Sequence, residues 1–356
     1  MSKPKILNFA PREEPEEIRR TLIDAGYEVV AGDRAWHEPR RNHEDAFVAA
    51  AREAVAMMGT SIRATPVSRR VMEASQRLRI VAKYTVGVDD IDVEAATDLG
   101  ILVCHAPTEA NCFGVAESTM TAMLTLLKKV RERDAAVRAG LWREPFLSGT
   151  YVGSRQSDGY PGVTVGLVGL GRIGTRVAQL LAPWRVRLIA YDPYIEPAHF
   201  LLAGAAPVDY DTLLGESDVV SFHVVLTRET RGMLGERELA LMKRDAIVIN
   251  TARGKVIDEA ALASALSAGR IAGAAIDAFE DEPLPADSPL RALGDRVLLS
   301  PHAASFNEGA ELRPGIAWAT RSVLTALAGE VPDNVYNKEV IPRWKERFGG
   351  SSLAST

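Results

Sequence analysis

The sequence predicts an α/β protein of two domains, each with a parallel sheet covered by helices on both faces. Short apolar runs rich in β-branched residues alternate with helical patterns along most of the chain, a rhythm typical of parallel sheets. The chain has 356 residues, more than one hydrophobic core usually spans, so two domains are expected.

The composition is that of an ordinary globular protein. Apolar residues make up 47% and charged residues 25%. The net charge of -5, without a block of like charge, indicates neither a nucleic-acid nor an anionic-membrane partner. No apolar run is long enough to span a bilayer, and the N-terminus turns acidic where a secretory signal would be apolar. The two cysteines, Cys104 and Cys112, lack metal-ligand spacing, which predicts reduced thiols, no metal site and a cytoplasmic location.

The first half predicts five strands separated by amphipathic helices. The expected strands are residues 5–10, 27–32, 54–59, 79–85 and 101–106. Between the first two, Glu16 and Arg20 can pair across one helical turn, and Gly26 is placed to end that helix. This repetition of strand and helix predicts the first parallel sheet.

The pattern changes at residue 114. Residues 114–140 follow one helical pattern of about 27 residues, longer than most helices within a domain. Its first part is apolar almost all round and its second part is charged, as expected of a helix buried between domains before it emerges. A loop rich in Gly, Ser, Pro and aromatic residues follows at 141–161.

The second half predicts about seven strands, the size of a complete dinucleotide-binding sheet. The runs that predict them are GVTVGLVGL, RLIAYD, GAAPVD, DVVSFHVV, AIVINTA, IAGAAIDAF and RVLLSPH. A helical pattern from Glu308 to about Gly329 and an irregular tail follow. We therefore expect two Rossmann-like or flavodoxin-like domains, one discontinuous (1–111 plus about 304–356) and one continuous (112–303).

The first strand of the second half leads into a G-x-G-x-x-G motif at Gly169, Gly171 and Gly174. The first glycine permits a tight turn, the second lets the backbone approach a pyrophosphate at the helix N-terminus, and the third allows close helix packing. The next strand ends in Asp192, about 18 residues later, where an acid can hold ribose hydroxyls. This order predicts a dinucleotide site; a capping turn followed by an ordinary loop aspartate is the alternative.

Asp192 also favours NAD over NADP. Its carboxylate would repel a 2′-phosphate, and Pro193 and Tyr194, neither of them basic, follow it. His199 and the nearby arginines remain open as partners of such a phosphate.

Three further strand ends carry groups suited to hydride-transfer chemistry, at the edge where open parallel sheets bind ligands. Arg253 follows a buried strand and can grip a carboxylate while polarising a neighbouring carbonyl. Asp277 ends the next strand, and acids at 280–282 follow in the turn. His302 follows the last strand, where a carboxylate at one imidazole nitrogen would stabilise its protonated form and make it a general acid.

Each of these groups also has a structural interpretation when it is taken alone. Arg253 could form a salt bridge, the acids could lie in a solvated turn that proline ends, and His302 could be a satisfied histidine at a strand end. Their joint placement after strands of one sheet favours an active site. Spacing does not decide which acid would contact His302.

The motifs GLVGLGRIG, YDP, NTARG, DAFEDEPLP and SPHAAS, in this order, resemble the D-isomer-specific 2-hydroxyacid dehydrogenases over nearly the whole chain. The resemblance implies an NAD-dependent oxidoreductase that interconverts a 2-oxo acid and a D-2-hydroxy acid by hydride transfer. It also implies that the first domain binds the substrate, that the second binds NAD, that the active site lies in the interdomain cleft, and that the protein is a homodimer.

The resemblance implies catalytic roles for three residues. Arg253 would bind the substrate carboxylate and carbonyl, Glu282 would partner the histidine, and His302 would donate the proton. The substrate carboxylate would also be held by the backbone N–H groups of Val86 and Gly87.

The resemblance likewise implies the residues that contact the cofactor. They are Arg172 and Ile173 at the pyrophosphate, His223, Val224 and Thr227 near the riboses, Thr251 and Ala252 along the nicotinamide, and Asp277 at its carboxamide.

The chain departs from the family pattern near the expected substrate site. Thr85 and Asp90 alter the usual GVGVDN, and Ser118 stands where a histidine is usual. The histidine loop reads HAAS, where two glycines often follow the histidine. Arg63 could be a second carboxylate-binding arginine. These differences leave the substrate open more than the reaction type.

Two other functions stay open. The first is a formate- or phosphite-oxidising dehydrogenase of the same superfamily, although formate enzymes resemble a pattern with glutamine where Glu282 stands. The second is an NADH-binding regulatory protein similar to the related transcriptional co-repressors, which need not keep Arg253, Glu282 and His302 together.

Overall fold

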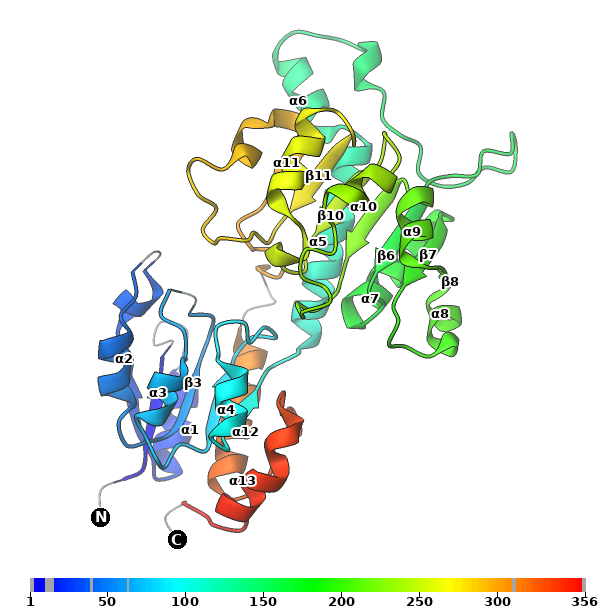
Figure 1. Ribbon diagram of the computed structural model, residues 1–356. Helices are drawn as coiled ribbons and strands as arrows, with labels where there is room; N and C mark the ends of the chain where they lie inside the picture. The colour runs from blue at the N-terminus through cyan, green and yellow to red at the C-terminus, as the bar shows by residue number, and fades with distance from the viewer. Residues whose placement is uncertain (1–2, 10–15, 39–40, 63, 309–311, 354–356) are drawn as a thin grey trace. The chain divides into compact units, whose positions relative to one another are not determined.

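A computed structural model describes residues 3–9, 16–38, 41–62, 64–308 and 312–353 (Figure 1). Arg63, the possible second carboxylate-binding arginine, lies outside the described residues. The chain divides into two compact units: unit 1 is Met1–Glu109 with Gly309–Thr356, and unit 2 is Ala110–Glu308. The sequence places these boundaries at residue 111 and at about residue 304.

Unit 1 contains a five-stranded parallel sheet in the order β2-β1-β3-β4-β5. This is the flavodoxin-like order of a doubly wound fold. Its strands are β1 (Lys5–Asn8), β2 (Glu28–Ala31), β3 (Ala54–Gly59), β4 (Ile80–Lys83) and β5 (Leu102–Cys104). Each lies within a predicted range. Strands β3 and β4 are buried at every position, as expected of a sheet that helices cover on both faces.

The helices of unit 1 come from both ends of the chain. They are α1 (Glu16–Asp24), η1 (Arg34–His37), α2 (Glu44–Ala51), α3 (Arg69–Glu73), α4 (Val93–Asp98), α12 (Arg313–Leu327), η7 (Lys338–Val340) and α13 (Ile341–Phe348). The apolar side of α12 packs on the sheet through Ile316 and Val323. Gly315 allows this approach, because a Cβ there would lie 2.0 Å from the carbonyl oxygen of Tyr84.

Unit 2 contains a seven-stranded parallel sheet in the order β12-β11-β10-β9-β6-β7-β8. Its strands are β6 (Thr164–Val168), β7 (Arg187–Tyr191), β8 (Ala206–Pro207), β9 (Val219–Phe222), β10 (Ile247–Asn250), β11 (Gly273–Ile276) and β12 (Val297–Leu299). The chain winds outward from β6 in one direction and then from β9 in the other. This is the order of dinucleotide-binding folds, so the predicted fold class is confirmed.

Helices cover both faces of this sheet. They are α5 (Glu109–Leu127), α6 (Val130–Arg138), η2 (Pro145–Leu147), α7 (Arg172–Leu181), η3 (Ala182–Trp184), α8 (Pro197–Ala203), α9 (Tyr210–Glu216), α10 (Glu236–Leu241), η4 (Gly254–Val256), α11 (Glu259–Ser267), η5 (Pro289–Ala292) and η6 (Gly294–Arg296). Alternate residues of a strand join different cores: Val248 packs with α9, α10 and α11, whereas Ile247 and Ile249 pack with α5, α7 and α8.

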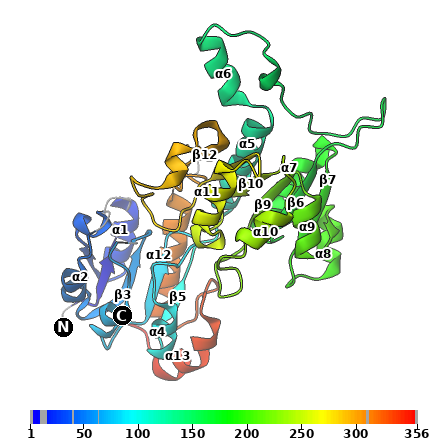
Figure 2. The same ribbon diagram turned by 45° about the horizontal axis from the view of Figure 1, so that its top comes forward.

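The single long helix expected at 114–140 is wrong, because the segment forms the two helices α5 and α6. Lys129, between them, has φ 52° and ψ 46°, a left-handed conformation that breaks the helix. The following loop closes the end of α5: the carbonyl of Leu127 accepts from the N–H of Thr150 at 2.8 Å. The break depends on this tertiary contact, which helical periodicity cannot reveal. Figure 2 shows α6 and the loop after it extending away from the sheet of unit 2.

Three sequence-based expectations concern membranes, metals and thiols. Within the described ranges, no helix combines the length and apolarity needed to cross a bilayer. The same residues hold no group of three or more His, Cys, Asp or Glu side chains arranged for a metal ion. Cys104 and Cys112 are free and buried, and burial raises the pKa of Cys104 to about 12. The cytoplasmic location stays a prediction.

Candidate active site

The glycine-rich turn joins β6 to α7, and its three glycines have different surroundings. Gly169 has φ 90°, and a Cβ there would lie 2.8 Å from the carbonyl oxygen of His223. At Gly174 a Cβ would lie 2.2 Å from the carbonyl oxygen of Gly169. A Cβ at Gly171 would meet nothing within 4 Å. Packing therefore requires the first and third glycines, and the second borders open space, as the approach of a pyrophosphate requires.

The N-terminus of α7 provides a binding position for an anion. Gly171 is its N-cap residue, so no side chain caps the helix. Arg172 and Ile173 begin its first turn, where backbone N–H groups and the helix dipole favour negative charge. The turn and the helix together fit the pyrophosphate of a dinucleotide.

Asp192, which directly follows β7, is fixed at the glycine-rich turn. Its Oδ2 accepts from the N–H of Leu170 at 2.9 Å, and its Oδ1 accepts from the N–H of Tyr194 at 3.0 Å. The carboxylate therefore lies where ribose hydroxyls could donate to its remaining lone pairs. His199, left open above as a phosphate partner, has its Nε2 3.0 Å from the Oγ1 of Thr175 in α7.

His223 packs against the back of the glycine-rich turn. Its N–H donates to the carbonyl of Val168 at 2.8 Å, and its Nε2 lies 2.9 Å from the Oγ of Ser221. Burial lowers the pKa of His223 to about 4, so the ring is neutral at neutral pH. Val224 and Thr227 follow in the loop after β9, where the Oγ1 of Thr227 accepts from the N–H of Thr230 at 3.2 Å.

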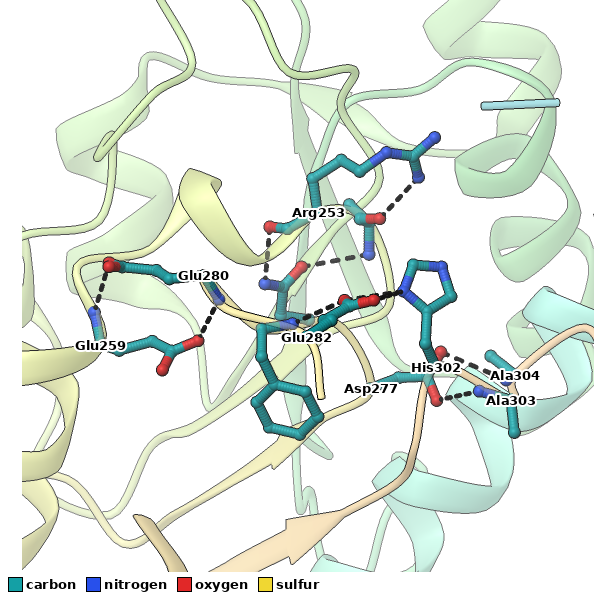
Figure 3. A network of polar contacts seen from close by, with 11 residues as sticks. Arg253, Glu259, Asp277, Glu280, Glu282, His302, Ala303 and Ala304 are labelled. Carbon is teal, nitrogen blue, oxygen red and sulfur yellow. Dashed lines mark hydrogen bonds and ion pairs between the residues drawn. The ribbon is translucent and has the colours of Figure 1, made fainter. Parts of the chain in front are cut away.

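Arg253, Glu282 and His302 follow β10, β11 and β12, which are neighbouring parallel strands. The carboxyl ends of parallel strands meet at one edge of a sheet, and Figure 3 shows the three side chains together at that edge. The structure thus brings together the predicted catalytic groups of the second half of the chain.

The imidazole of His302 contacts Glu282. Its Nδ1 lies 2.8 Å from Oε1 and 3.1 Å from Oε2 of the carboxylate. The side chain of Glu282 is 15% exposed and that of His302 is 34% exposed, so the pair is partly shielded from water. Oε1 also accepts from the N–H of Phe279 at 3.0 Å, which holds the carboxylate in place. Of the three acids that spacing left open, Glu282 is the one that contacts the histidine.

Asp277 anchors the loop that carries His302. Its two carboxylate oxygens accept from the N–H groups of Ala303 at 2.8 Å and Ala304 at 3.2 Å. Its backbone carbonyl accepts from the N–H of His302 at 2.8 Å. His302 itself has φ 52°, which this bonding sustains. The resemblance did not suggest this anchoring role, because it depends on backbone donors that no sequence motif marks.

Arg253 is positioned by one contact of its backbone and one of its side chain. The carbonyl of Arg253 accepts from the side-chain amide of Asn250 at 3.0 Å, and its Nη1 donates to the carbonyl of Ala252 at 2.8 Å. Gly254 is required by close packing. A Cβ there would lie 1.8 Å from the carbonyl carbon of Phe279, so the turn after β11 rests directly on Gly254.

A cavity of about 360 Å³ lies between α5 and the ends of β11 and β12. Its polar lining comes from Ser118, Thr121, Thr251, Asp277, Ser300 and Asn307. Two of these residues, Thr251 and Asp277, were expected at the nicotinamide. Ser118, which replaces a usual histidine, donates to the carbonyl of Ala304 at 2.7 Å and so supports the His302 loop from α5.

In unit 1, Val86 and Gly87 lie in the segment after β4. A buried ion pair between Lys83 and Asp90 joins the two ends of this segment. The Nζ of Lys83 lies 2.5 Å from Oδ2 of Asp90, and the two side chains are 0% and 3% exposed. Lys83 also donates to the carbonyl of Thr60 at 2.8 Å, and Asp90 accepts from the N–H of Ile62 at 2.6 Å. Asp90, a departure from the family pattern, therefore has a structural role.

The chain is similar to a known protein family and to several known enzymes. Residues 120–304 match a family model described as D-isomer specific 2-hydroxyacid dehydrogenase, NAD binding domain. A glyoxylate reductase of Thermofilum pendens is 38% identical over 96% of this chain and 96% of its own length. A D-3-phosphoglycerate dehydrogenase of Mycobacterium leprae is 40% identical over 83% of this chain, which spans only 55% of that protein.

Among solved structures, an NAD-dependent formate dehydrogenase of Staphylococcus aureus, in complex with NAD, superposes with a TM-score of 0.74. The two chains are 26% identical, and the match covers 89% of this chain and 93% of the other.

Proposed function

The chain belongs to the D-isomer specific 2-hydroxyacid dehydrogenase family, and we propose that it interconverts a 2-oxo acid and a D-2-hydroxy acid with NAD. One observation carries this proposal: Nδ1 of His302 lies 2.8 Å from the carboxylate of Glu282, at the sheet edge that also presents Arg253. An acid–base pair beside a carboxylate-binding cation suits reduction of a carbonyl next to a carboxylate.

In reduction, His302 is the general acid. Its Nδ1–H donates to Glu282, which leaves Nε2 to give a proton to the developing alkoxide. The carboxylate of Glu282 stabilises the imidazolium before transfer and keeps the ring oriented. Asp277 keeps the backbone of the histidine loop in position meanwhile. In the reverse direction, the neutral imidazole takes the hydroxyl proton.

Arg253 binds the substrate carboxylate and polarises the carbonyl. A guanidinium offers paired donors that match a carboxylate, and its charge stabilises the negative oxygen that forms during reduction. We further propose that the backbone N–H groups of Val86 and Gly87, in unit 1, donate to the substrate carboxylate.

The residues of unit 2 fit NAD. Gly171 and the first turn of α7, with Arg172 and Ile173, would hold the pyrophosphate, and Asp192 would hold the ribose hydroxyls. Thr251 and Asp277 line a cavity that would take the nicotinamide. When bound, NAD accepts or supplies the hydride.

The proposal is tested with a panel of 2-oxo acids. Purified protein is mixed with NADH and acids of increasing size and charge, including glyoxylate and 3-phosphohydroxypyruvate, which suit the names of the relatives. We expect NADH oxidation with at least one acid, and a product of D configuration wherever the product is chiral. Tight NADH binding without turnover would favour the regulatory alternative. Turnover only of formate or phosphite with NAD would favour the other dehydrogenases.

Cofactor preference is expected to depend on the charge of Asp192. Asp192→Asn keeps an acceptor for a backbone N–H but removes the charge that repels a 2′-phosphate, so we expect the preference for NADH over NADPH to fall about 10-fold. The measurement is kcat/KM with each cofactor. Asp209→Asn is the control, since Asp209 also accepts a backbone N–H, that of Thr212, but at the start of α9. An unchanged ratio in Asp192→Asn would contradict this role.

We also propose that the protein is a homodimer that associates through α6 and the loop after it. This arm exposes large apolar side chains, among them Trp142 at 72% and Phe146 at 56%, and extends away from its own sheet (Figure 1). Sedimentation velocity should show a dimer for the natural protein and a monomer for Trp142→Glu with Phe146→Glu. Leu202→Glu, at an exposed position of α8, should remain dimeric. A natural protein that sediments as a monomer would contradict the proposal.

A further inference from the structure

We propose that Glu259 and Glu280 form a reciprocal latch that positions Glu282 and, through it, His302. Neither glutamate contacts the histidine, so both are positioning residues rather than catalytic ones. The inference rests on the proposed function for its catalytic consequence, but the latch itself can be tested without a substrate.

The latch consists of two hydrogen bonds that cross between α11 and the turn after β11. The N–H of Glu259 donates to Oε1 of Glu280 at 3.2 Å, and the N–H of Glu280 donates to Oε1 of Glu259 at 2.5 Å. Each carboxylate therefore satisfies the backbone donor of the other residue. Figure 3 shows this pair on one side of the network and His302 on the other, with Glu282 between them.

The latch is anchored at the N-terminus of α11. Glu259 is the first residue of α11, and Asp258 caps the same helix by accepting from the N–H of Ala261 at 2.9 Å. Glu280 also reaches that N-terminus, where the helix dipole and the backbone N–H favour a negative group. The helix is packed into the core of unit 2 through Leu262 and Leu266, so it is a rigid point of attachment.

The turn held by the latch is the turn that sets the position of Glu282. Phe279, next to Glu280, donates its N–H to Oε1 of Glu282 at 3.0 Å. That same oxygen lies 2.8 Å from Nδ1 of His302. Two consecutive backbone N–H groups thus hold two carboxylates. The N–H of Glu280 donates to Glu259, and the N–H of Phe279 donates to Glu282.

Close packing limits the motion of this turn on a second side. The carbonyl group of Phe279 rests on Gly254, where a Cβ would lie within 2.0 Å of its oxygen. Gly254 directly follows Arg253 in the chain. The turn therefore packs against the residue that directly follows the proposed substrate-binding arginine, and it carries the acid that orients the proposed proton donor. A shift of this turn would disturb both groups.

The surroundings of Glu259 differ from those of an acid in a turn that only contacts water. Burial, with a further contribution from the neighbouring charges of Glu280 and Asp281, raises the pKa of the Glu259 carboxyl. Two acids brought together repel each other, and here a backbone donor compensates each of them. The latch needs an acceptor at position 259 and does not need its charge. Glutamine should therefore replace Glu259 with little effect, and alanine should not.

The test compares Glu259→Ala and Glu259→Gln with the control Glu236→Ala. Glu236 is the first residue of α10 and is exposed, so it matches Glu259 in helix position without touching the turn. Amide hydrogen exchange at Glu280 and Phe279 is followed by NMR, and kcat is followed against pH with the 2-oxo acid that reacts best.

In Glu259→Ala we expect exchange at both amides to accelerate about 10-fold or more, because the turn opens locally. We expect kcat to fall about 10-fold, the KM for NADH to stay unchanged, and the alkaline limb of the reduction profile to move to lower pH. The limb moves because a displaced Glu282 stabilises the imidazolium less. Glu259→Gln should restore natural behaviour in each measurement.

Two results would overturn the latch. One is unchanged exchange at Phe279 in Glu259→Ala, which would show that the contact to Glu282 does not depend on Glu259. The other is faster exchange with the kcat and pH profile of Glu236→Ala, which would make the pair structural only. If the natural protein reduces no 2-oxo acid, the proposed function fails, and the exchange at Phe279 still decides whether Glu259 holds the turn.

Discussion

Replacing His302 by alanine is expected to lower kcat for 2-oxo acid reduction by about 10²- to 10⁴-fold. Among the residues described, His302 is the only histidine at the edge of the unit 2 sheet whose imidazole contacts a carboxylate, and the variant loses it. NADH binding should persist, because the glycine-rich turn and Asp192 lie on other loops of the sheet. Steady-state NADH oxidation and NADH fluorescence titration measure the two effects separately.

The backbone of His302 calls for a second variant. Its φ of 52° strains most side chains, whereas asparagine tolerates this conformation better than most residues. His302→Asn should therefore lose turnover to a similar extent while retaining the loop. His37→Ala, which removes a ring 2.6 Å from the carbonyl oxygen of Phe9 in unit 1, is the matched histidine control. Natural turnover in both His302 variants would exclude it as the proton donor.

Replacing Lys83 by methionine is expected to lower the free energy of unfolding by about 3–5 kcal/mol. Lys83 and Asp90 are 0% and 3% exposed, so the change leaves a buried carboxylate without its cation. Urea denaturation followed by fluorescence reports the change, provided that unit 1 unfolds in one transition.

Two further variants separate the ion pair from general loss of packing. Lys83→Met with Asp90→Asn removes both charges and should be less destabilised than Lys83→Met alone. Lys243→Met breaks a pair with Asp218 that is 40% and 35% exposed, and should cost at most about 1 kcal/mol. If Lys83→Met were no more destabilising than Lys243→Met, the buried pair would not hold the segment after β4.

Local pattern was sufficient to predict the positions of the strands and the fold class. Each described strand lies within a predicted apolar run, and most of the strands are buried at every position, which requires apolar residues throughout. Helix length was not predictable in the same way. α5 ends at Leu127 because a loop more than twenty residues later in the chain supplies its terminal contact through Thr150, and periodicity carries no trace of it.

The features of the candidate site also separate into those that the sequence predicts and those that it does not. The sequence by itself determined the glycine-rich turn, Asp192, and the placement of Arg253 and His302 after neighbouring strands, since these follow from motif spacing and from the shared edge of parallel strands. It also determined family membership through the order of its motifs.

Only the tertiary structure decided which groups hold the site together. It turned Asp277 toward the backbone of the histidine loop, placed the Phe279 turn on Gly254, and paired Glu259 with Glu280. It also placed Glu282, the acid that the family resemblance had already indicated, 2.8 Å from Nδ1 of His302. These contacts join residues about 20 or more positions apart. Distance and direction between such groups are set by how helices and loops pack on the sheet, and composition and spacing do not contain that information.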